Sequence, residues 1–539
     1  MLLQADGQHT YAAEHLTTAL RLDPTMLRAA QRLGDIFSLG ILPGKPRLDE
    51  AGLVAALKFD RLDRDLVAAT ALHHLAANGH LANALQRGPV EGWDVVARRL
   101  CLKRTHEFLE SPLLLAVLEA GVVARFDIER LLTALRRAFL LEIPRERFGD
   151  RRLARFVVAL MRQSWLNEFA WFETPEETQR LANDPRSALR FLYRRPDPAE
   201  ANSDDLDDPS PVLASAVGAA LKEHGAWAAD IHHRAAQIPS LSPLADDTSR
   251  KVAEMYEQSP YPRWTGVPVY AESKFIEHMR SHFRGTELAF AEKPFEVLVA
   301  GCGTGRQAVS AALDYGPKAT VTAFDISRAS LGYASVMADR MRVGNLVLAH
   351  GDLNHVLEFT PSFRGRFQIV ECGGVLHHMA DPFGSWRKLI DCLAPGGIML
   401  IALYSRTARR NLDTLKAEAI HPGAGASDDR VRAYRRELLE RQGQWPGSEF
   451  MRSRDTYSLS GFRDYFMHVS ERTTDLLEIK AFLADNNLRF RGFLDLPVEA
   501  LQRTHPGARS PGDLEQWHAW EQQHPNAFSA MYQFYCTRN

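Results

Sequence analysis

Short apolar runs recur through the second half of the chain, and residues with a helical spacing of apolar positions lie between them. Apolar runs of this length are typical of strands that are buried on both faces of a sheet. After the first run, residues 306–314 have the Ala, Val and Leu content of a helix that packs back on the sheet. The pattern predicts an open α/β sheet with strands at residues 297–300, 321–324, 346–349, 367–370 and 398–403.

The first half of the chain has a helical pattern instead, because residues 47–195 contain apolar clusters with few strand signals. We expect an irregular all-α domain there. Before it, one group of residues matches the second helix of a tetratricopeptide repeat and another matches the first helix of the next repeat, which places residue 1 inside a repeat. The groups are Ala12, Leu16, Ala19 and Pro24, and Leu33, Gly34 and Phe37.

Repeat arrays of this kind hold protein or peptide partners on a concave surface, which makes a protein partner one interpretation of the helical domain. The alternative is a helical cap that only buries part of the second half. A segment rich in Pro, Ser and Asp then reads as a solvated linker. The predicted domains are partial repeats at 1–40, a helical domain at 41–195, the linker at 196–211, connecting helices at 212–249 and the α/β domain at 250–539.

Three glycines follow the first predicted strand at every second position, and Asp325 ends the second strand twenty positions after the last of them. A side chain at Gly301, Gly303 or Gly305 would block the turn or hold a ligand away from the amides at a helix N-terminus. Asp325 is placed to accept hydrogen bonds from two ribose hydroxyls. The spacing is one residue shorter than the dinucleotide fingerprint and favours a mononucleoside ligand. A tight structural turn is the alternative.

The motifs VLVAGCGTG (297–305), FDIS (324–327), GDL (351–353), GVLHHMADP (374–382) and LAPGGIML (393–400) occur in one order along the chain. Together they resemble class I S-adenosylmethionine-dependent methyltransferases. With YEQSPYPRW (256–264) and FRDYFMHV (462–469), the match resembles the bacterial group that carries N-terminal tetratricopeptide repeats, and it runs from Arg250 to the end of the chain.

This resemblance implies a Rossmann-like class I sheet of parallel strands, closed by a C-terminal antiparallel pair at residues 488–494 and 530–536. It implies S-adenosylmethionine as the cofactor. It also makes residues 404–474 an insertion after the fifth strand, which we interpret as a lid or an acceptor-recognition element. One departure is Val299, which stands where many class I enzymes carry an acid, so that any contact made by that acid must come from another group here.

The residues expected to bind the cofactor follow from the resemblance and from their places at strand ends. Asp352 is expected to meet the adenine edge through its carboxylate or a neighbouring amide, although an Asp that caps the next helix is an equal alternative. Arg263 could pair with the methionine carboxylate from a strap over the pocket, or it could belong to a linker pinned to the domain. The full set is Gly301, Gly303, Gly305, Asp325, Ile326, Asp352, Leu353, Gly373 and Arg263.

His377, His378 and His468 are the candidate catalytic residues. Methyl transfer is an in-line displacement, and the protein mainly aligns the acceptor and removes a proton. Histidine titrates near neutrality and could be that base. The favoured alternative for the pair at 377–378 is packing on the cofactor side, because the resembling enzymes carry such a pair with very different acceptors.

The composition is that expected of a soluble enzyme. The 65 basic and 67 acidic residues give no broad basic field, which disfavours a nucleic-acid partner. The five cysteines are widely spaced and form neither a disulfide framework nor a metal-ligand cluster, as expected in the cytoplasm, and we expect no metal. The start of the chain does not have the pattern of a signal peptide, and no apolar stretch is long enough to predict a membrane span.

Two functions therefore remain. The first is an enzyme that moves a methyl group from S-adenosylmethionine to an unidentified acceptor, which could be a protein held by the helical domain. The second is an adaptor that retains the cofactor while its helical repeats bind a protein. The intact glycines and Asp325 favour the enzyme, whereas Val299 and the unassigned base keep the adaptor in play.

Overall fold

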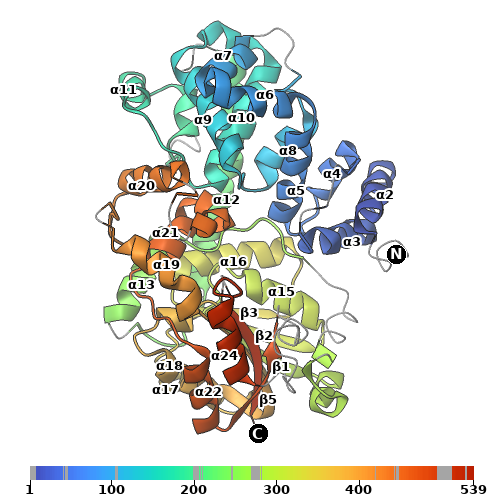
Figure 1. Cartoon of the computed structure of the whole chain (residues 1–539), viewed down its shortest axis with the longest axis vertical. Helices are drawn as coiled ribbons and strands as arrows, with labels where there is room; N and C mark the ends of the chain where they lie inside the picture. Colours follow the sequence, from blue (N-terminus) through green and yellow to red (C-terminus); the bar gives the residue numbers. More distant parts are fainter. Residues whose placement is uncertain are drawn as a thin grey trace. The chain divides into compact units, whose positions relative to one another are not determined.

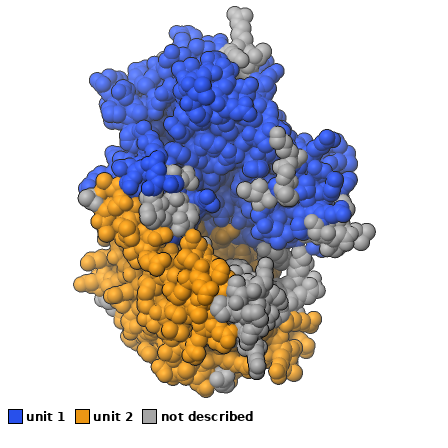
Figure 2. Space-filling view, viewed as in Figure 1, with its two compact units in different colours: residues 1–229, 263–268, 426–465 blue, residues 230–262, 269–425, 466–539 orange. Residues whose placement is uncertain are grey.

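The chain folds into two compact units, each assembled from separate stretches of sequence (Figure 2). Unit 1 comprises residues 1–229, 263–268 and 426–465, and unit 2 comprises residues 230–262, 269–425 and 466–539. The computed structural model describes residues 8–40, 42, 46–102, 107–197, 206, 208, 210–244, 247–268, 279–280, 282–418, 420–441, 443–444, 448–494, 513–528 and 531–538.

Unit 2 is built on a β-sheet (Figure 1). The sheet has seven strands in the order β3-β2-β1-β4-β5-β7-β6. The first five strands run parallel, and β7 lies antiparallel between β5 and β6. The predicted fold class is therefore confirmed. The strands are β1 (Phe295–Ala300), β2 (Ala319–Asp325), β3 (Leu346–His350), β4 (Phe367–Cys372), β5 (Leu393–Leu403), β6 (Leu488–Phe493) and β7 (Tyr532–Arg538).

Successive side chains of a strand point to opposite faces of the sheet. In β1 both sets include buried apolar residues, so helices cover both faces. Leu298 and Ala300 of β1 join a core that includes Trp386. Val297 and Val299 join a second core. The helical elements of unit 2 are α13 (Asp247–Gln258), η4 (Gly285–Glu292), α15 (Arg306–Tyr315), α16 (Arg328–Arg340), α17 (Val356–Phe359), η5 (Pro361–Phe363), η6 (Leu376–His378), α18 (Pro382–Cys392), α19 (Arg406–Lys416), α22 (Leu476–Asp485) and α24 (Leu514–Gln523).

The described residues of unit 1 form helices joined by turns and irregular segments, with one large core. Its elements are α2 (His9–Leu22), α3 (Leu27–Ser38), α4 (Glu50–Ala56), α5 (Arg64–Ala77), α6 (Gly79–Glu91), α7 (Trp93–Leu102), α8 (Pro112–Ala120), α9 (Phe126–Leu141), η1 (Arg145–Gly149), α10 (Arg151–Leu166), α11 (Pro175–Asn183), η2 (Ala188–Leu192), α20 (Asp428–Glu440), η7 (Ser448–Arg452) and η8 (Arg454–Tyr457). Two helices, α12 (Pro211–Gln237) and α21 (Leu459–Met467), begin in unit 1 and end in unit 2. Helices α2 and α3 lie where the repeat pattern was recognised, and their identity as tetratricopeptide repeats stays a prediction.

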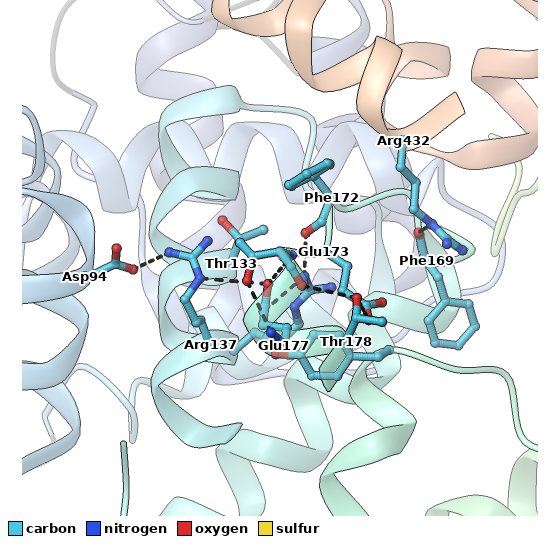
Figure 3. Close-up of polar contacts among 12 residues, drawn as sticks. Asp94, Thr133, Arg137, Phe169, Phe172, Glu173, Glu177, Thr178 and Arg432 are labelled. Carbon is cyan, nitrogen blue, oxygen red and sulfur yellow. Dashed lines mark hydrogen bonds and ion pairs between the residues drawn. The ribbon is translucent and has the colours of Figure 1, made fainter. Parts of the chain in front are cut away.

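A buried carboxylate organises the junction of α9 and α11 in unit 1 (Figure 3). Glu177 is fully buried and forms a capping box with Thr174 at the start of α11. Its Oε1 accepts a hydrogen bond from the Tyr193 hydroxyl at 2.7 Å and lies 3.4 Å from the Arg136 guanidinium. One polar centre thus satisfies a helix start and two buried side chains, which explains why an acid is tolerated in this core.

Part of the predicted insertion belongs to unit 1. The buried Arg435 of α20 makes two hydrogen bonds with Glu129 of α9, at 2.8 and 2.6 Å. Arg432 donates to the Phe169 carbonyl at 2.6 Å (Figure 3). Residues 404–425 and 466–474 of the insertion belong to unit 2. The second half of the chain therefore supplies structural residues to the helical unit.

Residues 263–268 join unit 1 in the same way. Thr265 donates to the Ala120 carbonyl at 2.7 Å, and the Val267 amide donates to the Asp60 carbonyl at 3.2 Å. Gly266 packs so closely on the Leu62 carbonyl that a side chain would collide with it. These contacts hold the segment through the Thr265 hydroxyl, the Val267 amide and the close approach of Gly266.

Breaking the buried pair should destabilise unit 1. We expect Glu129→Ala to lower the free energy of unfolding by about 3–5 kcal/mol, because the Arg435 charge stays buried without its partner. The matched control is Glu440→Ala, which removes an exposed partner of Arg436 on the same helix as Arg435 and should cost about 0.5 kcal/mol or less. Urea denaturation followed by circular dichroism measures both. Equal losses for the two variants would contradict the structural role of the buried pair.

Candidate functional site

The three glycines form the turn between β1 and α15, and each has a positive φ: 71° at Gly301, 52° at Gly303 and 84° at Gly305. Side chains rarely adopt this conformation. Space is restricted as well, because a Cβ added at Gly303 would lie 2.5 Å from the Tyr261 carbonyl oxygen. At Gly305 it would lie 2.5 Å from Ala334 Cβ of α16. Glycine is thus required by conformation and by packing.

Asp325 lies directly against this turn at the end of β2. Its Oδ2 accepts a hydrogen bond from the Gly303 amide at 2.7 Å, and its Oδ1 accepts one from the Ser327 amide at 2.9 Å. Burial raises the pKa of Asp325 to about 6, although hydrogen bonds from the Ser327 and Gly303 amides act in the opposite direction. The structure therefore brings the predicted glycines and the predicted acid together.

Asp352 follows β3, the strand beside β2. Its side chain is almost fully buried, and Oδ1 accepts a hydrogen bond from the Asn354 amide at 2.8 Å. Among the described residues, Oδ2 has no hydrogen-bond partner. Such a buried oxygen is costly unless a ligand or water satisfies it. Asp352 therefore stabilises the local turn with one oxygen and leaves the other for a donor.

The neighbours of these acids contribute differently. Ile326 is half-buried, and its carbonyl accepts a hydrogen bond from His350 Nε2 at 3.1 Å. Leu353 is buried, and its side chain belongs to the core, so that only its main chain could meet a ligand. Gly373 and Gly374 follow β4 and are half-buried. A Cβ added at Gly374 would meet no atom within 4 Å, so the main chain is uncovered at this strand end.

Arg263 lies in unit 1, whereas the glycine turn belongs to unit 2. Its Nε donates to Glu168 Oε1 at 3.2 Å, and Glu168 is buried. This contact has the character of the pinned linker that the sequence left as an alternative. The stretch just before Arg263 does meet the turn, because the Thr304 amide donates to the Tyr261 carbonyl at 3.3 Å.

The three candidate catalytic histidines are buried in unit 2. His377 stacks on Tyr404 with ring centres 3.6 Å apart, and His378 stacks on His468 at 3.5 Å. His378 Nδ1 donates to the Ser470 carbonyl at 2.9 Å, which leaves a lone pair on Nε2 of the neutral ring. His468 Nδ1 instead accepts from the Ser470 amide at 3.0 Å.

Burial keeps these rings neutral. It lowers the pKa of His378 to about 3 and that of His468 to about 2, and it lowers the pKa of His377 well below the usual range. The positive charge of Arg409 lowers the pKa values of His377 and His378 further. An efficient general base has a pKa near the working pH, so the three histidines are better suited to accept hydrogen bonds than to carry a proton.

A buried pair that the sequence analysis did not select lies beside the glycine turn. Glu371 of β4 is 4% exposed, and its Oε2 accepts a hydrogen bond from Gln307 Nε2 of α15 at 2.8 Å. Glu371 is in register with Val299, the position that departs from the family pattern. Glu371 directly follows a predicted apolar strand, which is a sequence signal for a buried acid. Its partner Gln307 is 64 residues away and could not be predicted.

Comparison with known proteins gives matches that include this site. Residues 292–437 match the family model described as a methyltransferase domain. An uncharacterized protein of Synechococcus is 30% identical over 213 residues, which are 37% of this chain and 48% of the relative. Methyltransferase str2 of Strobilurus tenacellus is 29% identical over 151 residues, which are 28% of this chain and 50% of the relative. The chain thus spans about half the length of these curated relatives.

Two solved structures are also similar to parts of the chain. PKMT2 from Rickettsia typhi in complex with AdoHcy is 17% identical with a TM-score of 0.36, over 52% of this chain and 55% of that chain. Geranyl diphosphate C-methyltransferase from Streptomyces coelicolor is 14% identical with a TM-score of 0.27, over 55% of this chain and 98% of that chain. Within the described part of the protein, none of the helices combines the length and apolarity that crossing a membrane requires.

The packing of the turn can be tested by placing a methyl group on two of its glycines. Gly303→Ala should destabilise the protein by more than Gly374→Ala, because both positions have positive φ but only the first would collide with the Tyr261 carbonyl. We expect Gly374→Ala to lower the free energy of unfolding by about 1 kcal/mol and Gly303→Ala to lower it by at least about twice that amount. Thermal denaturation of the two variants gives the difference. Equal melting temperatures would show that the main chain at Tyr261 moves away from the added methyl group without loss of stability.

Proposed function

We propose that this protein transfers a methyl group from S-adenosylmethionine to an acceptor. The observation that supports this most directly is the buried Oδ2 of Asp352, which has no partner in the described part of the chain. It lies at a strand end one strand away from Asp325 and two from the glycine turn. A donor on a bound ligand would satisfy that oxygen. The adenine amino group is such a donor.

The residues fit the cofactor in the order in which the strands lie. Asp352 at β3 would accept from adenine, and Asp325 at β2 would accept from the ribose hydroxyls. Main-chain groups of Ile326 and Leu353 would line the path between them. The glycine turn at β1 and Gly373 at β4 would then lie beside the sulfonium and the amino-acid end. The cofactor supplies the electrophilic methyl group.

The histidine cluster would act on the acceptor. A neutral His378 with its lone pair on Nε2 can accept a hydrogen bond from an O–H or N–H group and orient the atom that attacks the methyl carbon. His377 is 1% exposed, and neither ring nitrogen has a partner among the described residues, so a ligand hydrogen bond would also stabilise it. We propose that His377, His378 and His468 align the acceptor.

The acceptor could be a protein, because the repeat pattern near the start of the chain is typical of domains that hold protein or peptide partners. The low pKa values of the histidines favour the second candidate, a cofactor-binding adaptor without transfer. All five cysteines are free and buried, which supports a reducing, cytoplasmic location.

Asp325 should make cofactor binding depend on pH. Ribose hydroxyls donate best to the ionised carboxylate, so the affinity for S-adenosylhomocysteine should fall as the pH drops through about 6, where Asp325 takes up a proton. Asp325→Asn should weaken binding by about 2 kcal/mol at pH 8 and remove this pH dependence. Isothermal titration calorimetry measures both. Asp391→Asn, at an exposed position on α18, is the control and should behave as wild type. Absence of any wild-type binding would exclude both candidate functions.

Transfer itself separates the enzyme from the adaptor. Labelled methyl from S-adenosylmethionine should enter one fraction of a lysate of the source cells, with protein, nucleic acid and small molecules separated. His378→Ala should slow that transfer about tenfold, as expected for one lost hydrogen bond, and leave S-adenosylhomocysteine binding unchanged. His524→Ala, which removes a ring stacked on Trp520, is the control. Tight binding by wild type without labelling of any fraction would identify the adaptor.

A further inference from the structure

The carboxylate of Glu371 connects β4 to both ends of α15. Its Oε1 accepts a hydrogen bond from the Tyr315 hydroxyl at 2.5 Å, and its Oε2 accepts one from Gln307 Nε2 at 2.8 Å. Gln307 is the second residue of α15, and Tyr315 is the last. The helix that begins at the glycine turn is therefore held to the neighbouring strand by one buried acid.

This arrangement fixes the orientation of the Gln307 amide. A carboxylate accepts hydrogen bonds, so the amide nitrogen of Gln307 must face Glu371 and the amide oxygen must face away from it. That oxygen points to the end of β4, because a Cβ added at Gly373 would lie 2.8 Å from Gln307 Oε1. The missing side chain of Gly373 leaves the oxygen uncovered. A half-buried hydrogen-bond acceptor thus lies between the glycine turn and Gly373.

The order of the strands shows which part of the cofactor would reach this oxygen. In the proposed function, adenine lies at β3 and ribose at β2, and the next strands along the edge are β1 and β4. The amino-acid end of the cofactor then extends over β1 and β4. Its ammonium group is a cation with three donors, and a carbonyl oxygen backed by a carboxylate suits such a group.

We propose that Gln307 binds the ammonium group of the cofactor through Oε1 and that Glu371 is the positioning residue that orients Gln307. This assignment rests on the proposed function and adds the residues that recognise the amino-acid end. The buried charge of Glu371 lies on the far side of the amide and favours a positive ligand. Burial raises the pKa of Glu371, and an ammonium group nearby would favour its ionised form.

Two probes test the assignment by calorimetry: S-adenosylhomocysteine, which carries the ammonium group, and 5′-methylthioadenosine, which keeps the nucleoside and sulfur but lacks the amino-acid end. Gln307→Met keeps the side-chain length and removes the amide. We expect this variant to lower the affinity for S-adenosylhomocysteine roughly 10- to 100-fold. The affinity for 5′-methylthioadenosine should change less than about twofold. Glu371→Gln should show the same selective loss, because its amide can donate to Gln307 Oε1 and turn that group around.

Tyr315→Phe is the matched control, since it removes the other hydrogen bond to Glu371 without touching Gln307. It should lower the melting temperature and leave the ratio of the two affinities unchanged. Equal weakening of both probes by Gln307→Met, or no weakening of either, would overturn the assignment and leave the proposed function intact. Failure of wild type to bind either probe would instead overturn the proposed function together with this assignment.

Discussion

The hydrogen bond from the Gly303 amide to Asp325 joins the two central features of unit 2, the turn after β1 and the acid that ends β2. It can form only where the main chain comes close, and the positive φ of Gly303 together with the Tyr261 carbonyl packed against it leaves no room for a side chain. Once the turn is held in this way, α15 begins at the strand edge, and Gln307 is carried to the end of β4. The geometry of the whole edge therefore depends on a few missing Cβ atoms.

Buried polar groups are the second constraint, and they occur both with partners and without them. In unit 1, Arg435 and Glu129 are paired closely, and Glu177 is satisfied by a helix start and by Tyr193. In unit 2, Asp352 keeps an oxygen without a partner among the described residues, and His377 keeps two such nitrogens. Paired charges hold segments together, whereas unpaired buried atoms are places where a ligand can add hydrogen bonds.

The sequence was most informative where the determining contacts are local. Apolar runs located β1 to β4, because a buried strand needs only its own side-chain pattern, and the spacing of Gly301, Gly303, Gly305 and Asp325 located the turn. Contacts between residues that are distant in the chain could not be predicted from the sequence pattern. Gln307 meets Glu371 across 64 positions and Arg263 meets Glu168 across 95, while the pKa values of the histidines depend on burial that only packing reveals.

Unit 1 draws residues 426–465 from late in the chain, which affects the order of events during synthesis. Glu129 leaves the ribosome 306 residues before Arg435, and at typical elongation rates this is a delay of roughly 15 to 60 seconds. During that interval the nascent α9 must keep its carboxylate hydrated or paired with another group. The helical unit can therefore form its Arg435–Glu129 pair only after most of the sheet has been translated, and translation that ended before codon 426 would yield a helical unit without its last segment.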